Sequence, residues 1–101
     1  MNFEELYKRI QRCSAGDIAH TPEMLSYIVE EVGEVALALA VEGRLKNKEL
    51  KETTPQECCD VINSTLGLVA RYGWSMDDIL TYMDKKLKKW EKRVDNGEQK
   101  R

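Results

Sequence analysis

Cysteine and histidine are scarce in this chain, which contains three cysteines and one histidine. Cys13 stands alone, Cys58 and Cys59 are adjacent, and no pair has the two-residue gap that zinc sites favour. The odd count also argues against a disulfide framework, so we predict reduced and mostly buried thiols. The histidine, His20, precedes a predicted helix start and is expected at the surface.

Strong net charge and long apolar runs are also missing. The net charge is only −2, which gives no sign of a nucleic-acid binder. No apolar run of membrane-spanning length occurs, and the charged start MNFEELYKRIQR does not resemble a secretory leader. We therefore predict a cytoplasmic protein with no membrane and no nucleic-acid polymer as a partner.

The length of 101 residues predicts a single domain over residues 1–101. Its core is expected within about residues 2–94, and the polar tail 95–101 is expected to fray. A domain this small leaves much of its apolar surface uncovered unless it associates with other chains. Length alone therefore favours a homo-oligomer.

Proline occurs twice, and both copies mark predicted helix starts. In HTPEM and TTPQE, Thr21 and Thr54 precede a proline, which is typical of a cap followed by the first helical turn. Residues 3–16 carry apolar side chains at helical spacing, and Ser75 with Asp78 resembles a capping box for a helix that runs to Val94. Together these signals predict an all-α, four-helix bundle-like domain.

The last predicted helix carries a regular apolar seam. Its members alternate in steps of four and three residues: Met76, Leu80, Met83, Leu87, Trp90 and Val94. Such a seam suits another helix, either in the same chain or in a partner. The polar segment around residues 44–52, before the third helix, reads as a surface connection that can contain a short turn of helix.

Basic residues are missing from residues 21–43, which contain five acids and no lysine or arginine. A solvated helix face normally intersperses lysines with its acids. An apolar stripe centred on Ile28 and Val32 is predicted to face the core, and Glu31 and Glu34 share an adjoining face with Ala38. The repulsion between these carboxylates is left uncompensated.

The third helix repeats this pattern, because Glu57 and Asp60 lie three residues apart and no basic residue follows until Arg71. If the two acidic faces meet, four carboxylates share a small volume and require protons or bound cations. Oxygen ligands without nearby histidine or cysteine donors suit Mg²⁺, with Mn²⁺ as a possible substitute. The sequence therefore predicts a site for a hard divalent cation.

The two acidic motifs also carry a resemblance. EEVGE at 30–34, followed after 22 residues by ECCD at 57–60, resembles the EExxE and ExxD motifs of the MazG-like all-α nucleoside triphosphate pyrophosphohydrolases. The family's basic ending is similar to KLKKWEKR, with Lys86 and Arg93 in register. Trp90 stands where the family has asparagine, and fits the apolar seam instead. The resemblance covers residues 21–94.

The resemblance implies Mg²⁺-dependent hydrolysis of a nucleoside triphosphate between its α and β phosphates, by a homodimer or a homotetramer that cleans the nucleotide pool. It implies a metal site at Glu31, Glu34, Glu57 and Asp60. From the chemistry of the residues, Glu30 and Glu31 are the candidate catalytic carboxylates. Candidate substrate contacts are Lys86, Lys89, Arg93 and, on the same helix face as Asp60, Asn63.

Other interpretations remain open at this point. A related enzyme, phosphoribosyl-ATP pyrophosphohydrolase, would use similar acids, and a non-enzymatic helical adaptor would use only the apolar seam. Glu57 follows Thr54 by three residues and can be half of a capping box. The remaining acids can form an ordinary solvated face, and the basic run near residues 85–93 can do the same.

Overall fold

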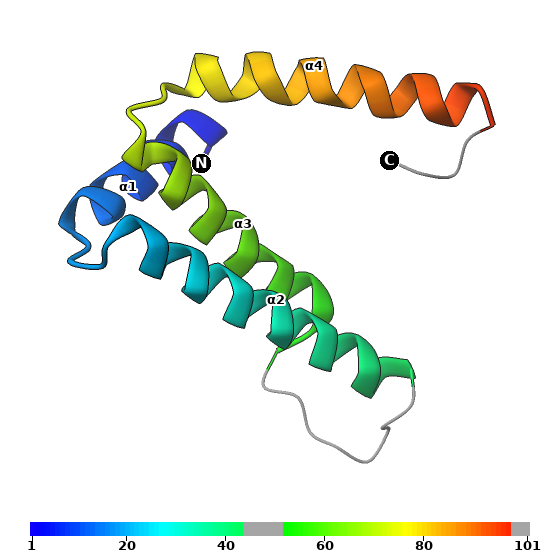
Figure 1. The fold of residues 1–101 in the computed structure, drawn as a ribbon, viewed down its shortest axis with the longest axis horizontal. Helices are drawn as coiled ribbons and strands as arrows, with labels where there is room; N and C mark the ends of the chain where they lie inside the picture. The colour runs from blue at the N-terminus through cyan, green and yellow to red at the C-terminus, as the bar shows by residue number, and fades with distance from the viewer. Residues whose placement is uncertain (44–51, 98–101) are drawn as a thin grey trace.

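The computed structural model describes residues 1–43 and 52–97, and every regular element in these ranges is a helix. Helix α1 spans Phe3–Gly16, α2 spans Thr21–Gly43, α3 spans Thr54–Arg71 and α4 spans Met76–Asp95 (Figure 1). The prediction of four helices and an all-α fold is confirmed. Residues 44–51, where the possible helical turn of the 44–52 connection would lie, and the end of the tail, residues 98–101, fall outside the described residues.

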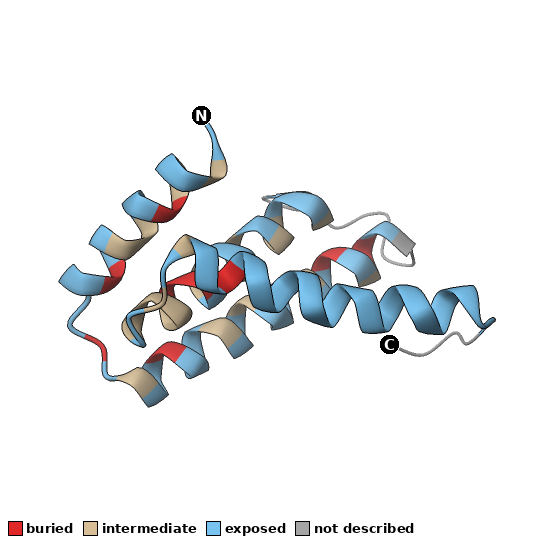
Figure 2. Ribbon diagram, turned by 90° about the horizontal axis from the view of Figure 1, so that it is seen from above, coloured by how far each residue is buried: buried red, intermediate tan, exposed pale blue. Residues whose placement is uncertain are grey.

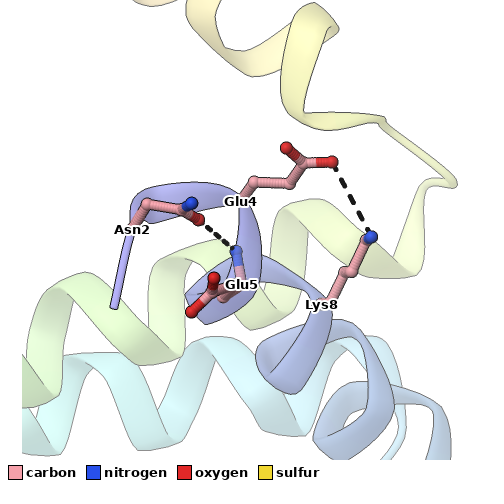
Figure 3. Close-up of polar contacts among 4 residues, drawn as sticks. All are labelled: Asn2, Glu4, Glu5 and Lys8. Carbon is pink, nitrogen blue, oxygen red and sulfur yellow. Dashed lines mark hydrogen bonds and ion pairs between the residues drawn. The ribbon is translucent and has the colours of Figure 1, made fainter.

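Helix α1 begins at a side-chain cap. The Asn2 Oδ1 atom accepts a hydrogen bond from the Glu5 backbone N–H at 2.9 Å (Figure 3). This bond satisfies one of the four N–H groups that a helix start leaves without a partner. One turn later, Lys8 forms an exposed ion pair with Glu4 at 3.7 Å. Local sequence thus accounts for the start of α1 without tertiary contacts.

Helix α2 begins one residue earlier than the threonine–proline signal predicts. Thr21 is already helical, and the Met24 backbone N–H donates to the His20 carbonyl at 3.1 Å. His20 is therefore the last residue before the helix, a position that the sequence predicted for Thr21. Its side chain is exposed, as expected.

Helix α3 shows the same shift. Thr53, not Thr54, caps the helix, and the capping box is completed by Gln56. Glu57 is therefore not the acid of a capping box, and that alternative explanation for it is wrong. The predicted box between Ser75 and Asp78 at the start of α4 is confirmed.

Helices α2 and α3 form an antiparallel hairpin, and α1 packs across α3 at one end of it (Figure 1). The predicted inward stripe of α2 is correct only in part: Met24 is buried and Ile28 and Val35 are partly buried, but Val32 and Leu39 are exposed. The other buried apolar side chains of α2 are Ala38 and Val41. The inward face is therefore rotated from the predicted stripe toward the adjoining face, so that Glu31 is partly buried as well.

The core lies where α1, α3 and the start of α4 meet, around the buried side chains of Tyr7, Leu66 and Ile79. The Tyr7 hydroxyl donates to the Trp74 carbonyl at 2.7 Å, and burial raises the pKa of this phenol. On the α2 side, the buried Ser14 hydroxyl donates to the Gly67 carbonyl at 2.7 Å. The first bond ties α1 to the connection between α3 and α4, and the second ties α1 to α3 itself.

Helix α4 leaves the other helices after its first turn. Every residue of α4 from Leu80 onward is exposed, which Figure 2 shows as continuous pale blue along the helix. The radius of gyration is 16.2 Å, against roughly 13 Å for a compact domain of this length. Within one chain, three helices and the start of the fourth pack together, with Met76 against the core, whereas Leu80, Met83, Leu87 and Val94 of the apolar seam are exposed.

Two sequence predictions concern the surface. Cys13 and Cys59 are exposed and Cys58 is partly buried, so the prediction of mostly buried thiols is wrong for the single chain, although all three are unpaired as expected. Among the described helices, none has the length and low charge that crossing a membrane would require.

Candidate metal centre

The two acidic motifs meet across the α2–α3 hairpin. Carboxylate oxygens of Glu34, from α2, and of Glu57 and Asp60, from α3, all lie within 4.8 Å of one another. The i, i+3 spacing puts both α3 acids on one helix face, and the hairpin turns that face toward α2. Three of the four predicted metal ligands are therefore together in the structure.

Glu57 is the most constrained member of this group. Its Oε2 atom is shielded from solvent and has no hydrogen-bond partner among the described residues. Burial raises the pKa of this carboxyl above its ordinary value. Hydrogen bonding with Glu34 and the negative charges of Glu34, Glu52 and Asp60 raise the pKa further. The Glu57 carboxyl therefore resists ionisation unless a cation lies nearby.

Glu31, the fourth predicted ligand, lies beside the group but is held by a different contact. Its Oε1 atom accepts a short hydrogen bond from the Ser64 hydroxyl of α3. Ser64 was not among the predicted site residues, although the sequence contains a signal for it. Ser64 lies four residues after Asp60 and seven after Glu57, which places all three on the same helix face. Its hydroxyl fixes one of the acids of α2 against α3.

Glu30 has a different environment. It is exposed on α2 and is not a member of the carboxylate group, although it lies one helical turn before Glu34. No cation neutralises the group within the described ranges, where the ion pairs join Lys8 to Glu4 and Lys88 to Asp84. Among the described residues, the carboxylates of Glu34, Glu57 and Asp60 thus have no basic partner.

Asn63, a predicted substrate contact, is exposed and lines a cavity between α1, α2 and α3. The cavity has a volume of about 360 Å³. Other lining residues are Arg9, Arg12 and Cys13 from α1, Tyr27 from α2 and Ser64 from α3. Since Ser64 also bonds Glu31, the cavity adjoins this acid.

The predicted basic contacts are not brought to the carboxylates within one chain. Lys86, Lys89 and Arg93 are exposed on the part of α4 that has left the other helices. Trp90, expected in the apolar seam, is 41% exposed. The acidic and basic parts of the predicted site are therefore separate in the single chain.

The donor atoms fit a hard divalent cation. All three grouped residues offer carboxylate oxygens, and the unpartnered Glu57 oxygen is a ligand atom that protein hydrogen bonds leave unused. Mg²⁺ and Mn²⁺ prefer oxygen ligands, and a doubly charged ion offsets the repulsion among the acids. Glu34, Glu57 and Asp60 are thus the residues best suited to hold such an ion, with Glu31 adjacent.

Comparison with known proteins gives no independent assignment: no family model, no curated protein and no solved structure matches this chain. The functional interpretation therefore depends on the geometry of the carboxylates and on the motifs that supply them.

Proposed function

We propose that this protein is a Mg²⁺-dependent nucleoside triphosphate pyrophosphohydrolase that cleaves between the α and β phosphates and acts on the cytoplasmic nucleotide pool. The observation that carries the proposal is the convergence of Glu34, Glu57 and Asp60, with one Glu57 oxygen shielded and unpartnered. The motifs that resemble the MazG-like family are the same motifs that supply these carboxylates. Sequence pattern and geometry thus support one chemistry.

In this proposal, Glu34, Glu57 and Asp60 hold the ion. Glu31, which is held by its bond to Ser64, adds a fourth carboxylate beside them. Mg²⁺ supplies Lewis acidity that neutralises phosphate charge at the scissile bond. We assign to Glu30 and Glu31 the orientation of a water molecule and the acceptance of its proton. The water oxygen bonds to the α phosphorus, the bond to the bridging oxygen breaks, and pyrophosphate leaves.

In this proposal, the basic residues of α4 contribute to the site when copies of the chain associate. Lys86, Lys89 and Arg93 offer donors for phosphate oxygens, with Arg93 able to bind bidentately. They lie on a helix whose apolar side chains Leu80, Met83, Leu87 and Val94 are exposed in the single chain. We expect a homodimer or a homotetramer in which these helices are covered by another copy.

The decisive experiment measures pyrophosphate release from a panel of canonical and modified ribo- and deoxynucleoside triphosphates and from phosphoribosyl-ATP, with and without Mg²⁺. We expect Mg²⁺-dependent release from at least one compound, and its loss in Asp60→Asn. Glu23→Gln, which changes an acid of α2 outside the carboxylate group, is the matched control. Absence of release from every compound, or full activity of Asp60→Asn, would contradict the proposal.

One observation favours a second candidate. The exposed apolar seam of α4 suits a helical adaptor that binds another protein without catalysis. That function requires neither a cation nor the unpartnered Glu57 oxygen. The same assay separates the two candidates, because an adaptor releases no pyrophosphate from any compound in the panel.

A further inference from the structure

The cavity between α1, α2 and α3 has a definite position relative to the carboxylates. Ser64 is part of its wall and also donates to Glu31. Asp60 lies one helical turn from Ser64, and Glu57 lies about two turns away, so roughly 5–10 Å separates the cavity wall from the carboxylate group along α3. A ligand that binds a cation with one end can therefore reach the cavity with the other.

The chemistry of the cavity wall differs from that of the carboxylates. Apolar side chains of Leu6, Ile10 and Met24 contribute to it, and Tyr27 adds an aromatic ring. Its volume of about 360 Å³ lies within the range of small-molecule sites, which is roughly 300–1,000 Å³. An apolar wall with an aromatic residue suits a flat heterocycle better than it suits a phosphate chain.

Polar groups stand at the edge of the same cavity. Asn63 offers an amide that can both donate and accept, and Arg12 offers donors only. Arg12 has no hydrogen bond or ion pair among the described residues, whereas Arg9 donates to the Met1 sulfur at 3.0 Å. The polar edge can therefore bind the ring nitrogens, carbonyls or sugar hydroxyls of a ligand whose ring lies against the apolar wall.

The wall is preformed by contacts that do not involve a ligand. The buried Ser14 hydroxyl holds α1 to the Gly67 carbonyl of α3. Met24 contacts the same point from α2, since a side chain at Gly67 would meet its Cε atom at 3.9 Å. Three helices thus converge on one end of the cavity and fix its shape before binding.

From these observations we infer that this cavity binds the nucleoside part of the substrate, with the phosphates directed toward Glu34, Glu57 and Asp60. The inference rests on the proposed function, because the phosphates and their cation define which end of the ligand enters the cavity. It adds α1 to the site, and in particular it assigns Arg12 and Tyr27 as contacts of the base or the sugar.

Cys13 provides a probe, because it lines the cavity and is exposed. We would measure its rate of alkylation by N-ethylmaleimide in the full chain with Mg²⁺, using peptide mass spectrometry. The ligands are the α,β-imido analogues of the nucleoside triphosphates in the panel, and inorganic tripolyphosphate as the matched ligand without a nucleoside. Cys59 of α3, which is exposed but does not line the cavity, is the internal reference.

We expect at least one analogue to slow Cys13 alkylation about tenfold relative to Cys59 at about ten times its Kd, because only ligand-free protein reacts. Tripolyphosphate should leave the ratio unchanged. Equal protection by tripolyphosphate would overturn the inference, since the cavity would then bind phosphates. Hydrolysis of a nucleotide whose analogue gives no protection would overturn it as well, while leaving the proposed function intact.

A pair of variants provides an independent measurement. Cys13→Trp fills the cavity from an exposed position, and we expect it to raise KM for the best substrate at least tenfold with little change in kcat. Lys8→Trp places the same ring on another face of α1 and should leave KM unchanged. An unchanged KM in Cys13→Trp would overturn the inference. Protection of Cys13 by an analogue without pyrophosphate release would instead identify a nucleotide-binding protein and contradict the proposed function alone.

Discussion

The α2–α3 hairpin and helix α4 use charge in opposite ways. Residues 21–43 contain acids without one basic residue, and the acids of α2 and α3 converge. In α4, acids and bases are mixed, and Asp84 pairs with Lys88 at 2.9 Å on an exposed surface. Mixed charges on an exposed helix are explained by solubility alone. Like charges gathered between two helices cost stability, which supports the proposal that these acids have a function.

The sharpest test of this comparison removes one acid from each region. Glu57→Gln should reduce Mg²⁺-dependent pyrophosphate release by about 100-fold or more, the upper end of what losing a group around a metal costs. Glu91→Gln, an exposed acid of α4, should leave the rate unchanged. Steady-state kinetics on both variants decides the matter. Similar rates in the two variants would show that the converged acids have no special role.

The second test concerns the apolar seam of α4. Leu87 is 48% exposed in the single chain, and Leu87→Glu should dissociate the proposed oligomer because it places a charge in the proposed interface. Thr81→Glu, on another face of α4, should leave the mass unchanged. Multi-angle light scattering after gel filtration measures both. A wild-type protein that is monomeric at all concentrations would show that the seam does not bind another copy.

The third test measures stability with metal ions. Mn²⁺ or Mg²⁺ that binds only the folded protein should raise Tm by several degrees, and the rise should grow with ion concentration. Glu57→Gln should show little or no rise, because one ligand is lost. In metal-free buffer the same variant should melt at a higher temperature than the wild type, since a repulsive charge is gone. Equal metal-induced shifts in the two proteins would argue against a site at Glu57.

The fourth test uses pH in metal-free buffer. The pKa of Glu57 is raised above its ordinary value of 4.5, so the folded chain holds this proton more tightly than the unfolded chain does. The stability associated with the proton is present below pH 4.5 and is lost as the pH rises through the higher folded value. The Tm advantage of Glu57→Gln should therefore appear above pH 4.5 and vanish below it. An advantage that does not depend on pH would have another cause.

The sequence predicted that each acid pair lies on one helix face, but it left open whether the two faces meet and how each helix is oriented. Two of the signals are local: Glu57 and Asp60 have i, i+3 spacing, and α2 contains no basic residue. Neither signal depends on how the helices pack. The inward face of α2 was predicted only in part, because apolar residues surround most of this helix, and periodicity alone does not select one face. The structure selects the face that contains Ala38 and Val41.

Helix caps and the direction of α4 show two further limits. Thr53 and Thr54 are both acceptable caps, and the choice depends on Gln56 returning a hydrogen bond to Thr53. The seam of α4 predicts a helix partner but contains no information on which chain supplies it. Ser64, in contrast, could have been predicted from the sequence, because its spacing from Asp60 matches one helical turn.

The smallest expected effect comes from the charge pair that needs no functional explanation. The side chains of Lys88 and Asp84 are 70% and 62% exposed, so water and salt screen their attraction. Asp84→Asn should leave Tm within experimental error at physiological salt, although it removes one charge just as Glu57→Gln does. Thermal denaturation of the two variants in the same metal-free buffer makes the comparison direct. Asp84→Asn could instead change Tm as much as Glu57→Gln does. The effect of a charge on thermal stability would then not depend on whether the charge lies between two helices or on an exposed helix.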